Sequence, residues 1–188
     1  NEGTMTERST GTIRVERMAK VGRIWLDRPA VHNAFNSKMI GELRAALAVL
    51  GADESVRVVV LSGTGKSFCA GADLNWMREI IRFSYEQNLA ESLELAEWLD
   101  ELSALPKPTI ARVNGAAIGG GAGFLSACDI VVASTDAVFG LSEVKIGLVP
   151  ACIAPYVLRR TGDSRARQYF LTGERFDARR ALEIGLVN

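Results

Sequence analysis

The sequence predicts an α/β fold, because strand-like and helix-like segments alternate along most of its 188 residues. Two runs rich in β-branched residues, 56–61 and 109–113, have the nearly continuous apolar character of strands buried on both faces. Each run leads directly into a glycine-rich loop, 62–73 and 114–123. Loops that leave the strands of such a fold gather at one end of the sheet, where ligands usually bind. We therefore expect one α/β domain with a site built from these two loops.

The first elements are a hairpin and a helix. Residues 12–18 and 23–26 alternate between apolar and polar side chains on either side of a turn, which predicts two antiparallel strands. Ser37 is a candidate N-cap for a helix that stops at Gly51 and has its apolar residues on one face. We expect this helix to cover a sheet.

The later elements repeat the order of strand, loop and helix. After the first loop, leucines between Leu89 and Leu102 recur at three- and four-residue steps, which predicts a long amphipathic helix. After the second loop, the pattern predicts a buried helix over 120–128 and strands over 129–133 and 138–140.

The domain organisation is simple. Residues 1–11 are polar and lack a periodic pattern, so we expect a disordered tail or a remnant of an expression vector. Residues 12–188 are predicted to form one core domain. The sequence stops just after a helical pattern and its glycine cap, without a closing element, and we expect the chain to be incomplete at this end.

Composition excludes several classes of partner. The chain has 22 basic and 22 acidic residues and no basic block, which argues against nucleic acid. Its apolar runs are shorter than the roughly 20 residues of a membrane span, so we expect no membrane association and a cytoplasmic protein. The chain has three cysteines, Cys69, Cys128 and Cys152, and their wide spacing favours reduced thiols over a disulfide framework. Cys69 lies in the first loop, and we favour a packing role for its side chain over a reactive thiol.

Common nucleotide-binding motifs do not account for the glycines of the two loops. The segment 65–67, Gly-Lys-Ser, resembles a P-loop, but Val60 stands where its first glycine should be. Neither loop fits the dinucleotide-binding register, because a phenylalanine takes the place of the last glycine. His32 is the only histidine and no C-x-x-C spacing occurs, which disfavours a hydrolase triad and a zinc site. We expect no metal and no redox cofactor, and chemistry that uses carboxylates and backbone groups.

Several motifs taken together resemble the crotonase, or enoyl-CoA hydratase/isomerase, superfamily. The resemblance runs from about Thr12 to the last residue. Its markers are Leu26-Asp27-Arg28-Pro29 with Asn33-Ala34, Phe68-Cys69-Ala70-Gly71-Ala72-Asp73-Leu74, Pro106-Lys107-Pro108, Asn114-Gly115, Gly119-Gly120-Gly121, Cys128-Asp129-Ile130, Phe139-Gly140-Leu141-Ser142-Glu143 and Gly147-Leu148-Val149-Pro150. Within the superfamily, residues 71–78 and 169–176 look most like bacterial methylglutaconyl-CoA and isohexenylglutaconyl-CoA hydratases, which act in leucine and terpene degradation.

The resemblance implies a spiral of repeated ββα units followed by a C-terminal helical part that takes part in trimer assembly. Most of that helical part would lie beyond Asn188. The complete protein would then be a homotrimer or a dimer of trimers.

The resemblance also assigns catalytic groups. The backbone N–H groups of Ala72 and Gly120 correspond to an oxyanion hole, which binds the thioester carbonyl oxygen and stabilises the negative charge of an enolate. Glu143 corresponds to the acid/base that exchanges a proton with the substrate carbon skeleton. Many hydratases of the family have a second glutamate just after the triple glycine, and this sequence has Gly123 there.

The remaining assignments concern substrate and CoA binding. They fall on Arg28, Lys66, Phe68, Ala70, Ala72, Asp73, Leu74, Gly119 and Gly120. Arg28 and Lys66 are candidate partners of CoA phosphates, although isolated basic residues are more often simply solvated. Asp73 is favoured as the N-cap of a helix that begins near Leu74. Trp76 and Met77 fit an acyl pocket and core packing equally well.

Three functions follow from these assignments. The first is an enoyl-CoA hydratase that adds water to a 2-enoyl-CoA, with branched glutaconyl-type esters among the candidate substrates in fatty acid, leucine or terpene metabolism. The second is a Δ3,Δ2-enoyl-CoA isomerase that uses Glu143 as its single acid/base. The third is an acyl-CoA-binding protein without catalytic activity. In each of them CoA is part of the ligand and not a separate cofactor.

Overall fold

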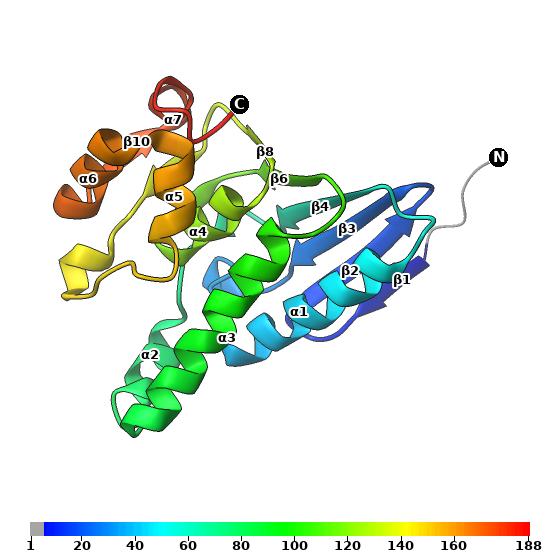
Figure 1. Ribbon diagram of the computed structural model, residues 1–188, viewed down its shortest axis with the longest axis horizontal. Coiled ribbons are helices and arrows are strands. Elements are labelled where there is room, and N and C mark those ends of the chain that lie inside the picture. Colours follow the sequence, from blue (N-terminus) through cyan, green and yellow to red (C-terminus); the bar gives the residue numbers. More distant parts are fainter. Residues whose placement is uncertain (1–5) are drawn as a thin grey trace.

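The computed structural model describes residues 6–188, which form two β-sheets and their covering helices (Figure 1). The six-stranded sheet has the order β1-β2-β3-β4-β6-β8, with β1 at Thr6–Ser9, β2 at Ile13–Met18, β3 at Val21–Leu26, β4 at Val58–Gly63, β6 at Thr109–Val113 and β8 at Ile130–Ala133. The four-stranded sheet has the order β10-β9-β7-β5, with β5 at Ser67–Cys69, β7 at Ala116–Ile118, β9 at Val138–Gly140 and β10 at Arg175–Asp177.

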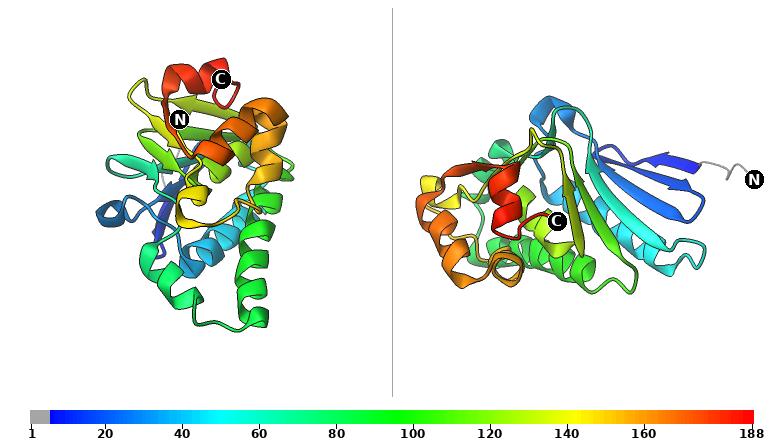
Figure 2. Two further views of the ribbon diagram at one scale, coloured as in Figure 1. Left: turned by 90° about the vertical axis from the view of Figure 1, so that its left-hand side faces the viewer. Right: turned by 90° about the horizontal axis from the view of Figure 1, so that it is seen from above.

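Seven α-helices and two short 3₁₀ helices connect these strands within residues 6–188. They are η1 (Pro29–Val31), α1 (Ser37–Ala52), α2 (Leu74–Ile80), α3 (Tyr85–Ser103), α4 (Gly120–Ala127), η2 (Glu143–Ile146), α5 (Ala154–Thr161), α6 (Asp163–Thr172) and α7 (Ala178–Glu183). Helices α1 and α3 lie side by side along one face of the six-stranded sheet, as the views in Figure 1 and Figure 2 both show. No helix of the described residues is both long enough and apolar enough to cross a membrane.

The strand order confirms the α/β fold and the repeated ββα unit. Strands β4, β6 and β8 lie parallel in one sheet, and each is followed by a short strand, β5, β7 or β9, in the other. The short strands are parallel to one another as well. Each pass of the chain therefore crosses from the first sheet to the second, helices return the first two passes, and the glycine-rich loops lie at these two crossings.

Helix α4 is central to the packing of the molecule. Its residues from Gly121 to Ala127 are all buried. The Phe124 ring lies 4.9 Å from the ring of Phe35 and 5.7 Å from that of Trp98 on α3, measured between centroids. The start of α4 is thus held between the first loop, α3 and the segment before α1, which keeps the backbone of the second loop in a fixed position.

The N-terminal region corrects one prediction. Residues Thr6–Ser9 were expected to belong to an unstructured tail, but they form β1 and pair antiparallel with β2. All four residues of this strand are polar, so its sequence has no apolar face from which a strand could be predicted, and backbone pairing with the edge of β2 stabilises it instead. Residues 1–5 lie outside the described part of the chain.

The two long helices follow the prediction with local differences. Helix α1 continues past Gly51 to Ala52, because no chain reversal occurs at the glycine. Helix α3 buries Trp98, Leu99 and Leu102, whereas Leu89 and Leu93 nearer its start are about half exposed. The predicted apolar face is therefore covered only along the C-terminal half of α3.

The N-cap of α1 is Asn36 rather than Ser37, because the Asn36 side chain accepts a hydrogen bond from the Met39 N–H at 3.0 Å. We predict that Asn36→Ala lowers the free energy of unfolding by about 1 kcal/mol, since it leaves a helix N–H without a partner. Ser37→Ala is the control and should change this free energy by less than about 0.5 kcal/mol. Urea unfolding of both variants measures the difference, and equal losses would contradict the assignment of the cap.

Candidate functional site

The two glycine-rich loops meet at Gly71 and Gly120. Gly71 has a φ of +97°, and a Cβ built on it would lie 3.0 Å from Ile118 O and 3.8 Å from Gly120 N. This close approach brings the backbone of the first loop against the start of α4 and leaves no room for a side chain between them. The sequence prediction that the two loops form one site is therefore consistent with their positions.

Two backbone N–H groups at this meeting point are free to bind a ligand. The Phe35 N–H donates to Gly71 O at 2.9 Å and the Asp73 N–H donates to Phe35 O at 2.8 Å, which fixes the backbone on both sides of Ala72. Among the hydrogen bonds of residues 6–188, none has the Ala72 N–H or the Gly120 N–H as its donor. Gly120 is the first residue of α4, where helical N–H groups have no intrahelical acceptor.

The carboxyl group of Glu143 lies against Gly119, the residue before Gly120. Glu143 begins η2, and its Oε1 would be 3.1 Å from a Cβ built on Gly119, the N-cap of α4. Its Oε2 is buried and has no hydrogen-bond partner among the described residues. Burial raises the pKa of Glu143 above the usual value of 4.5, because water no longer stabilises the charged form. A carboxyl group of this kind is suited to exchange protons with a bound ligand.

Three further glycines make close packing possible beneath the site. A Cβ on Gly120 would lie 2.5 Å from Phe35 Cε1. A Cβ on Gly121 would overlap Cys69 O, and one on Gly123 would overlap Cγ2 of Ile153. The glycines therefore allow close packing and also leave the Gly120 N–H uncovered.

Cys69 is a packing residue in the structure. Its side chain is fully buried beneath the first loop, and burial raises the pKa of its thiol to about 12. The thiolate is the reactive form of cysteine, so a thiol with this pKa is inert near neutral pH.

Asp73 and Arg28 bind each other. The Asp73 carboxylate is the N-cap of α2, accepts from the Asn75 N–H at 2.9 Å and pairs with Nη2 of Arg28 at 2.8 Å. Partial burial opposes ionisation of Asp73, but these two donors outweigh it and hold the pKa of the carboxyl group below its usual value. Arg28 also donates to Ala34 O at 2.6 Å. Both side chains thus have structural partners, and contact with a CoA phosphate stays a prediction for Arg28.

The other predicted ligand-binding residues differ in exposure. Leu74, Lys66 and Ala70 are exposed around the first loop. The side chain of Phe68 is fully buried in the core, because β5 turns it inward, so its predicted contact with substrate cannot involve the ring.

A polar pocket of about 320 Å³ lies beside the first loop. It is lined by Arg28, Asn36, Ser37, Lys38, Asp73, Asn75, Trp76 and Glu79. The Trp76 ring packs edge-on against Phe35 at 5.9 Å, which supports a role in core packing, and its part in an acyl pocket stays a prediction. A larger hollow of about 550 Å³ lies between α1 and α3, and none of the predicted site residues lines it.

Two residues of the site were not found by sequence reasoning. Phe35 lies against Gly120 and pairs with Ala72 through the backbone, and Ile153 lies against Gly123. Phe35 follows the Asn33-Ala34 marker directly, which was a usable signal. Ile153 lies in an irregular segment without periodicity, so its contact with α4 was visible only in three dimensions. No group of three or more His, Cys, Asp or Glu side chains within residues 6–188 is placed to hold a metal ion.

Comparison with known proteins identifies the family. The family model described as enoyl-CoA hydratase/isomerase matches residues 16–188. A Thermus thermophilus protein whose name provisionally assigns it to the enoyl-CoA hydratases is 41% identical over 176 residues, which cover 94% of this chain and 69% of the relative.

Solved structures agree as well. An enoyl-CoA hydratase from Shewanella pealeana superposes with a TM-score of 0.92 at 45% identity, over 94% of this chain and 66% of that one. Pseudomonas aeruginosa AtuE superposes with a TM-score of 0.91 at 42% identity, over 94% of this chain and 69% of that one. The chain spans between 56% and 69% of the length of the curated relatives it matches. Because the family model matches residues 16–188, the chain belongs to the enoyl-CoA hydratase/isomerase family.

Proposed function

We propose that this protein is an enoyl-CoA hydratase, which adds water to the double bond of a 2-enoyl-CoA thioester. One observation carries the proposal. The N–H groups of Ala72 and Gly120 have no acceptor among residues 6–188, and the half-buried Glu143 carboxyl group, without a partner for Oε2, lies against Gly119, next to Gly120. Two donors aimed at one oxygen and one carboxyl group near the adjoining carbons are the groups that this addition requires.

The reaction would proceed through an enolate. The thioester oxygen accepts hydrogen bonds from the Ala72 and Gly120 N–H groups, which draws electron density from the conjugated double bond and makes C3 electrophilic. The Glu143 carboxylate takes a proton from water as the water oxygen bonds to C3. The resulting enolate carries its negative charge on the thioester oxygen. Glu143 then gives its proton to C2, and the carboxylate is restored.

An isomerase is the second candidate, and the single carboxyl group favours it. Position 123, where many hydratases of the family have a second glutamate, is glycine in this chain. One base is sufficient to remove a proton from C2 of a 3-enoyl-CoA and to return it to C4 of the dienolate. This path uses the same two N–H groups and needs no water.

A protein that binds acyl-CoA without turnover is the third candidate. Such a protein would keep the two loops but would not depend on Glu143. For the hydratase we propose branched glutaconyl-CoA esters as a substrate class, because of the resemblance in residues 71–78 and 169–176. The homotrimer or dimer of trimers and the cytoplasmic location stay predictions for the complete protein.

The test mixes the protein separately with linear 2-enoyl-, linear 3-enoyl- and branched glutaconyl-CoA esters and follows the absorbance of the conjugated thioester. Loss of conjugation from a 2-enoyl or glutaconyl ester supports the hydratase. Gain of conjugation from the 3-enoyl ester alone would replace the hydratase by the isomerase. Binding of all esters without any change in absorbance would favour the binding protein.

The raised pKa of Glu143 predicts a pH-dependent stability. A carboxyl group whose folded pKa lies above its unfolded pKa contributes stability that is complete below the unfolded pKa and is lost as the pH rises through the folded pKa. Glu143→Gln removes this dependence, so the stability of the variant relative to the wild type should increase as the pH rises from about 4 towards neutrality. Urea unfolding over this range measures it, and a constant difference would show that burial does not perturb the group.

A further inference from the structure

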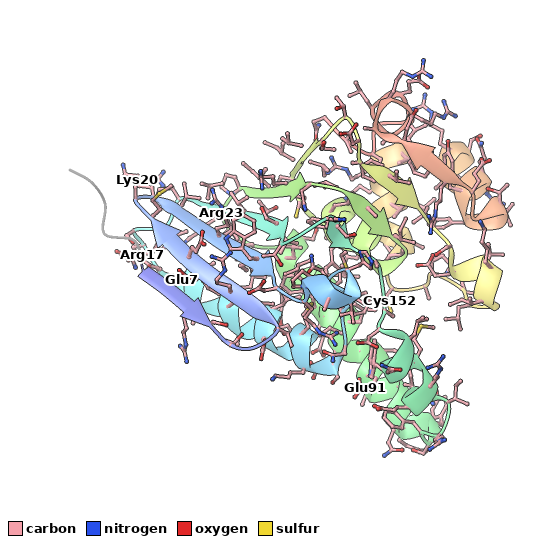
Figure 3. All side chains as sticks on the ribbon, turned by 180° about the vertical axis from the view of Figure 1, so that it is seen from behind. Glu7, Arg17, Lys20, Arg23, Glu91 and Cys152 are labelled. Carbon is pink, nitrogen blue, oxygen red and sulfur yellow. The ribbon has the colours of Figure 1, made fainter. Side chains whose placement is uncertain are left out.

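Phe35 contacts the backbone at both Ala72 and Gly120, yet the proposed reaction gives it no role. It stands between η1 and α1 and is 2% exposed. Figure 3 shows this region from behind, where η1, drawn in pale blue, lies between the six-stranded sheet and α2. Phe35 thus stands where one residue reaches both glycine-rich loops.

The backbone of Phe35 orients the Ala72 N–H. The Phe35 N–H donates to Gly71 O at 2.9 Å, and Phe35 O accepts from the Asp73 N–H at 2.8 Å. Gly71 O and the Ala72 N–H belong to the same planar trans peptide group, in which the oxygen and the hydrogen point in opposite directions. The hydrogen bond to Gly71 O therefore directs the Ala72 N–H away from the Phe35 backbone.

The ring of Phe35 lies against Gly120. A Cβ built on Gly120 would lie 2.5 Å from Cε1 and 2.6 Å from Cζ of the ring. The ring also packs against Phe124 and Trp76, with ring centroids at 4.9 Å and 5.9 Å. It therefore limits how closely the first turn of α4, which carries the Gly120 N–H, can approach the Phe35 segment and the first loop bonded to it.

Asn33 anchors the Phe35 segment to the first loop. Its side chain is fully buried, and Nδ2 donates to Thr64 O and to Ser67 O, each at 2.8 Å. Its Oδ1 accepts from the Arg28 N–H at 2.8 Å. A shift of Phe35 relative to the loop would strain or break these bonds, and buried hydrogen-bonding groups are costly to leave without a partner.

We propose that Phe35 is a positioning residue, which sets the direction of the Ala72 N–H and its separation from the Gly120 N–H so that both reach one oxygen. Its backbone acts on the first donor, and its ring acts on the second. Hydrogen bonds weaken steeply as their angle closes, so small displacements of either donor matter. This inference rests on the proposed hydratase function, in which the two donors bind the thioester oxygen.

The first test is Phe35→Leu. Leucine has carbons at the δ position but lacks the ε and ζ carbons that face Gly120, while the backbone bonds to the first loop remain. In steady-state kinetics kcat should fall by about tenfold, which is part of the hundred- to thousand-fold loss that removal of a whole donor causes. In calorimetric titration the affinity for a saturated acyl-CoA should stay within about threefold, because the donors bind the charged transition state more strongly than the neutral carbonyl.

The second test combines Phe35→Leu with Gly120→Ala. Alone, Gly120→Ala forces the new methyl group against Cε1 and Cζ of the ring, and kcat should fall by about a hundredfold or more. In the double variant these atoms are absent, and the δ carbon lies 3.8 Å away, which is an ordinary contact. Its kcat should therefore exceed the product of the two single losses by about tenfold or more. Coupling that appears in the free energy of unfolding but not in kcat would overturn the inference, because the ring would then only pack the core.

Phe176→Leu is the matched control. The Phe176 ring is also buried, at 8% exposure, and packs against Tyr169 at 4.1 Å between centroids. It lies on β10, at the edge of the four-stranded sheet opposite β5. Its replacement should lower the free energy of unfolding and leave kcat within about twofold of the wild type. If Phe35→Leu is unfolded by circular dichroism, Phe35→Met takes its place, with a smaller loss of kcat in the same direction.

Exchange of the C2 protons of a saturated acyl-CoA for solvent deuterium separates this inference from the proposed function, since it requires an enolate but no hydration. If the folded Phe35→Leu variant keeps kcat and the exchange rate within about twofold of the wild type, the inference is wrong and the proposed hydratase is unaffected. A wild-type protein that exchanges these protons but hydrates no ester would overturn the hydratase. An exchange rate about tenfold lower in Phe35→Leu would then support the inference, and an unchanged rate would overturn it. A wild-type protein with neither activity would overturn both.

Discussion

Glu143→Gln is expected to lower kcat for the proposed hydration by about a hundred- to ten-thousand-fold, the usual contribution of a general acid–base group. The amide has nearly the same shape as the carboxyl group but cannot take a proton from water or deliver one to C2. Because the two N–H groups belong to the backbone of Ala72 and Gly120, the affinity for an acyl-CoA should stay within a few-fold of the wild type. Steady-state kinetics and calorimetric titration with a saturated acyl-CoA measure the two quantities.

Glu54→Gln is the control for this experiment. Glu54 is exposed and precedes β4, so it lies at the opposite end of that strand from the first glycine-rich loop. Its substitution should leave kcat unchanged. If Glu143→Gln kept more than about a tenth of the wild-type kcat, Glu143 would not be the acid/base and the proposed mechanism would be wrong.

Gly121→Ala is expected to have the second large effect. Its Cβ would overlap the carbonyl oxygen of Cys69 and lie 2.9 Å from the Cys69 Cβ. The first of these atoms belongs to the backbone, so the two loops have to move apart, and the Ala72 and Gly120 N–H groups move with them. We expect a loss of about 1–3 kcal/mol in the free energy of unfolding from the overpacking. We also expect a hundred- to thousand-fold loss in kcat, about that of one oxyanion donor.

Gly41→Ala is the control for Gly121→Ala. Gly41 lies in α1, and a Cβ there would have no atom within 4 Å. This substitution should stabilise the protein by about 0.5–1 kcal/mol, since alanine is the better helix former, and it should leave kcat unchanged. A Gly121→Ala variant that keeps the wild-type kcat would show that the spacing of the two loops is not needed for activity.

Several regular elements of this fold were predicted from the sequence. Strand β6 and strand β9 have the expected bounds, and α3 and α4 lie where the apolar patterns placed them. Strands β5 and β7 were assigned to the glycine-rich loops, because each lies inside a glycine-rich segment whose composition is typical of a loop. The N-cap of α1 was displaced by one residue, since Asn36 and Ser37 are both good caps and only the backbone angles distinguish them.

The backbone groups of the candidate site could be proposed from the sequence, but the side-chain contacts around them could not. The loop glycines indicated a site built from backbone groups, and the resemblance to the enoyl-CoA hydratase/isomerase superfamily singled out Ala72, Gly120 and Glu143. The structural partners of Arg28 and the burial of Phe68 depend on contacts between segments far apart in the sequence, as does the contact of Ile153 with Gly123. No local pattern encodes such contacts.

Hydrogen exchange at C2 of a saturated acyl-CoA tests the central claim most directly. A saturated ester can be neither hydrated nor isomerised, so the exchange of its C2 protons for solvent deuterium, followed by NMR, reports only on enolate formation. The account predicts exchange in the wild-type protein and its loss in Glu143→Gln. Tight binding of the ester without exchange in the wild type would contradict the claim that the two N–H groups and Glu143 form an enolate-stabilising site.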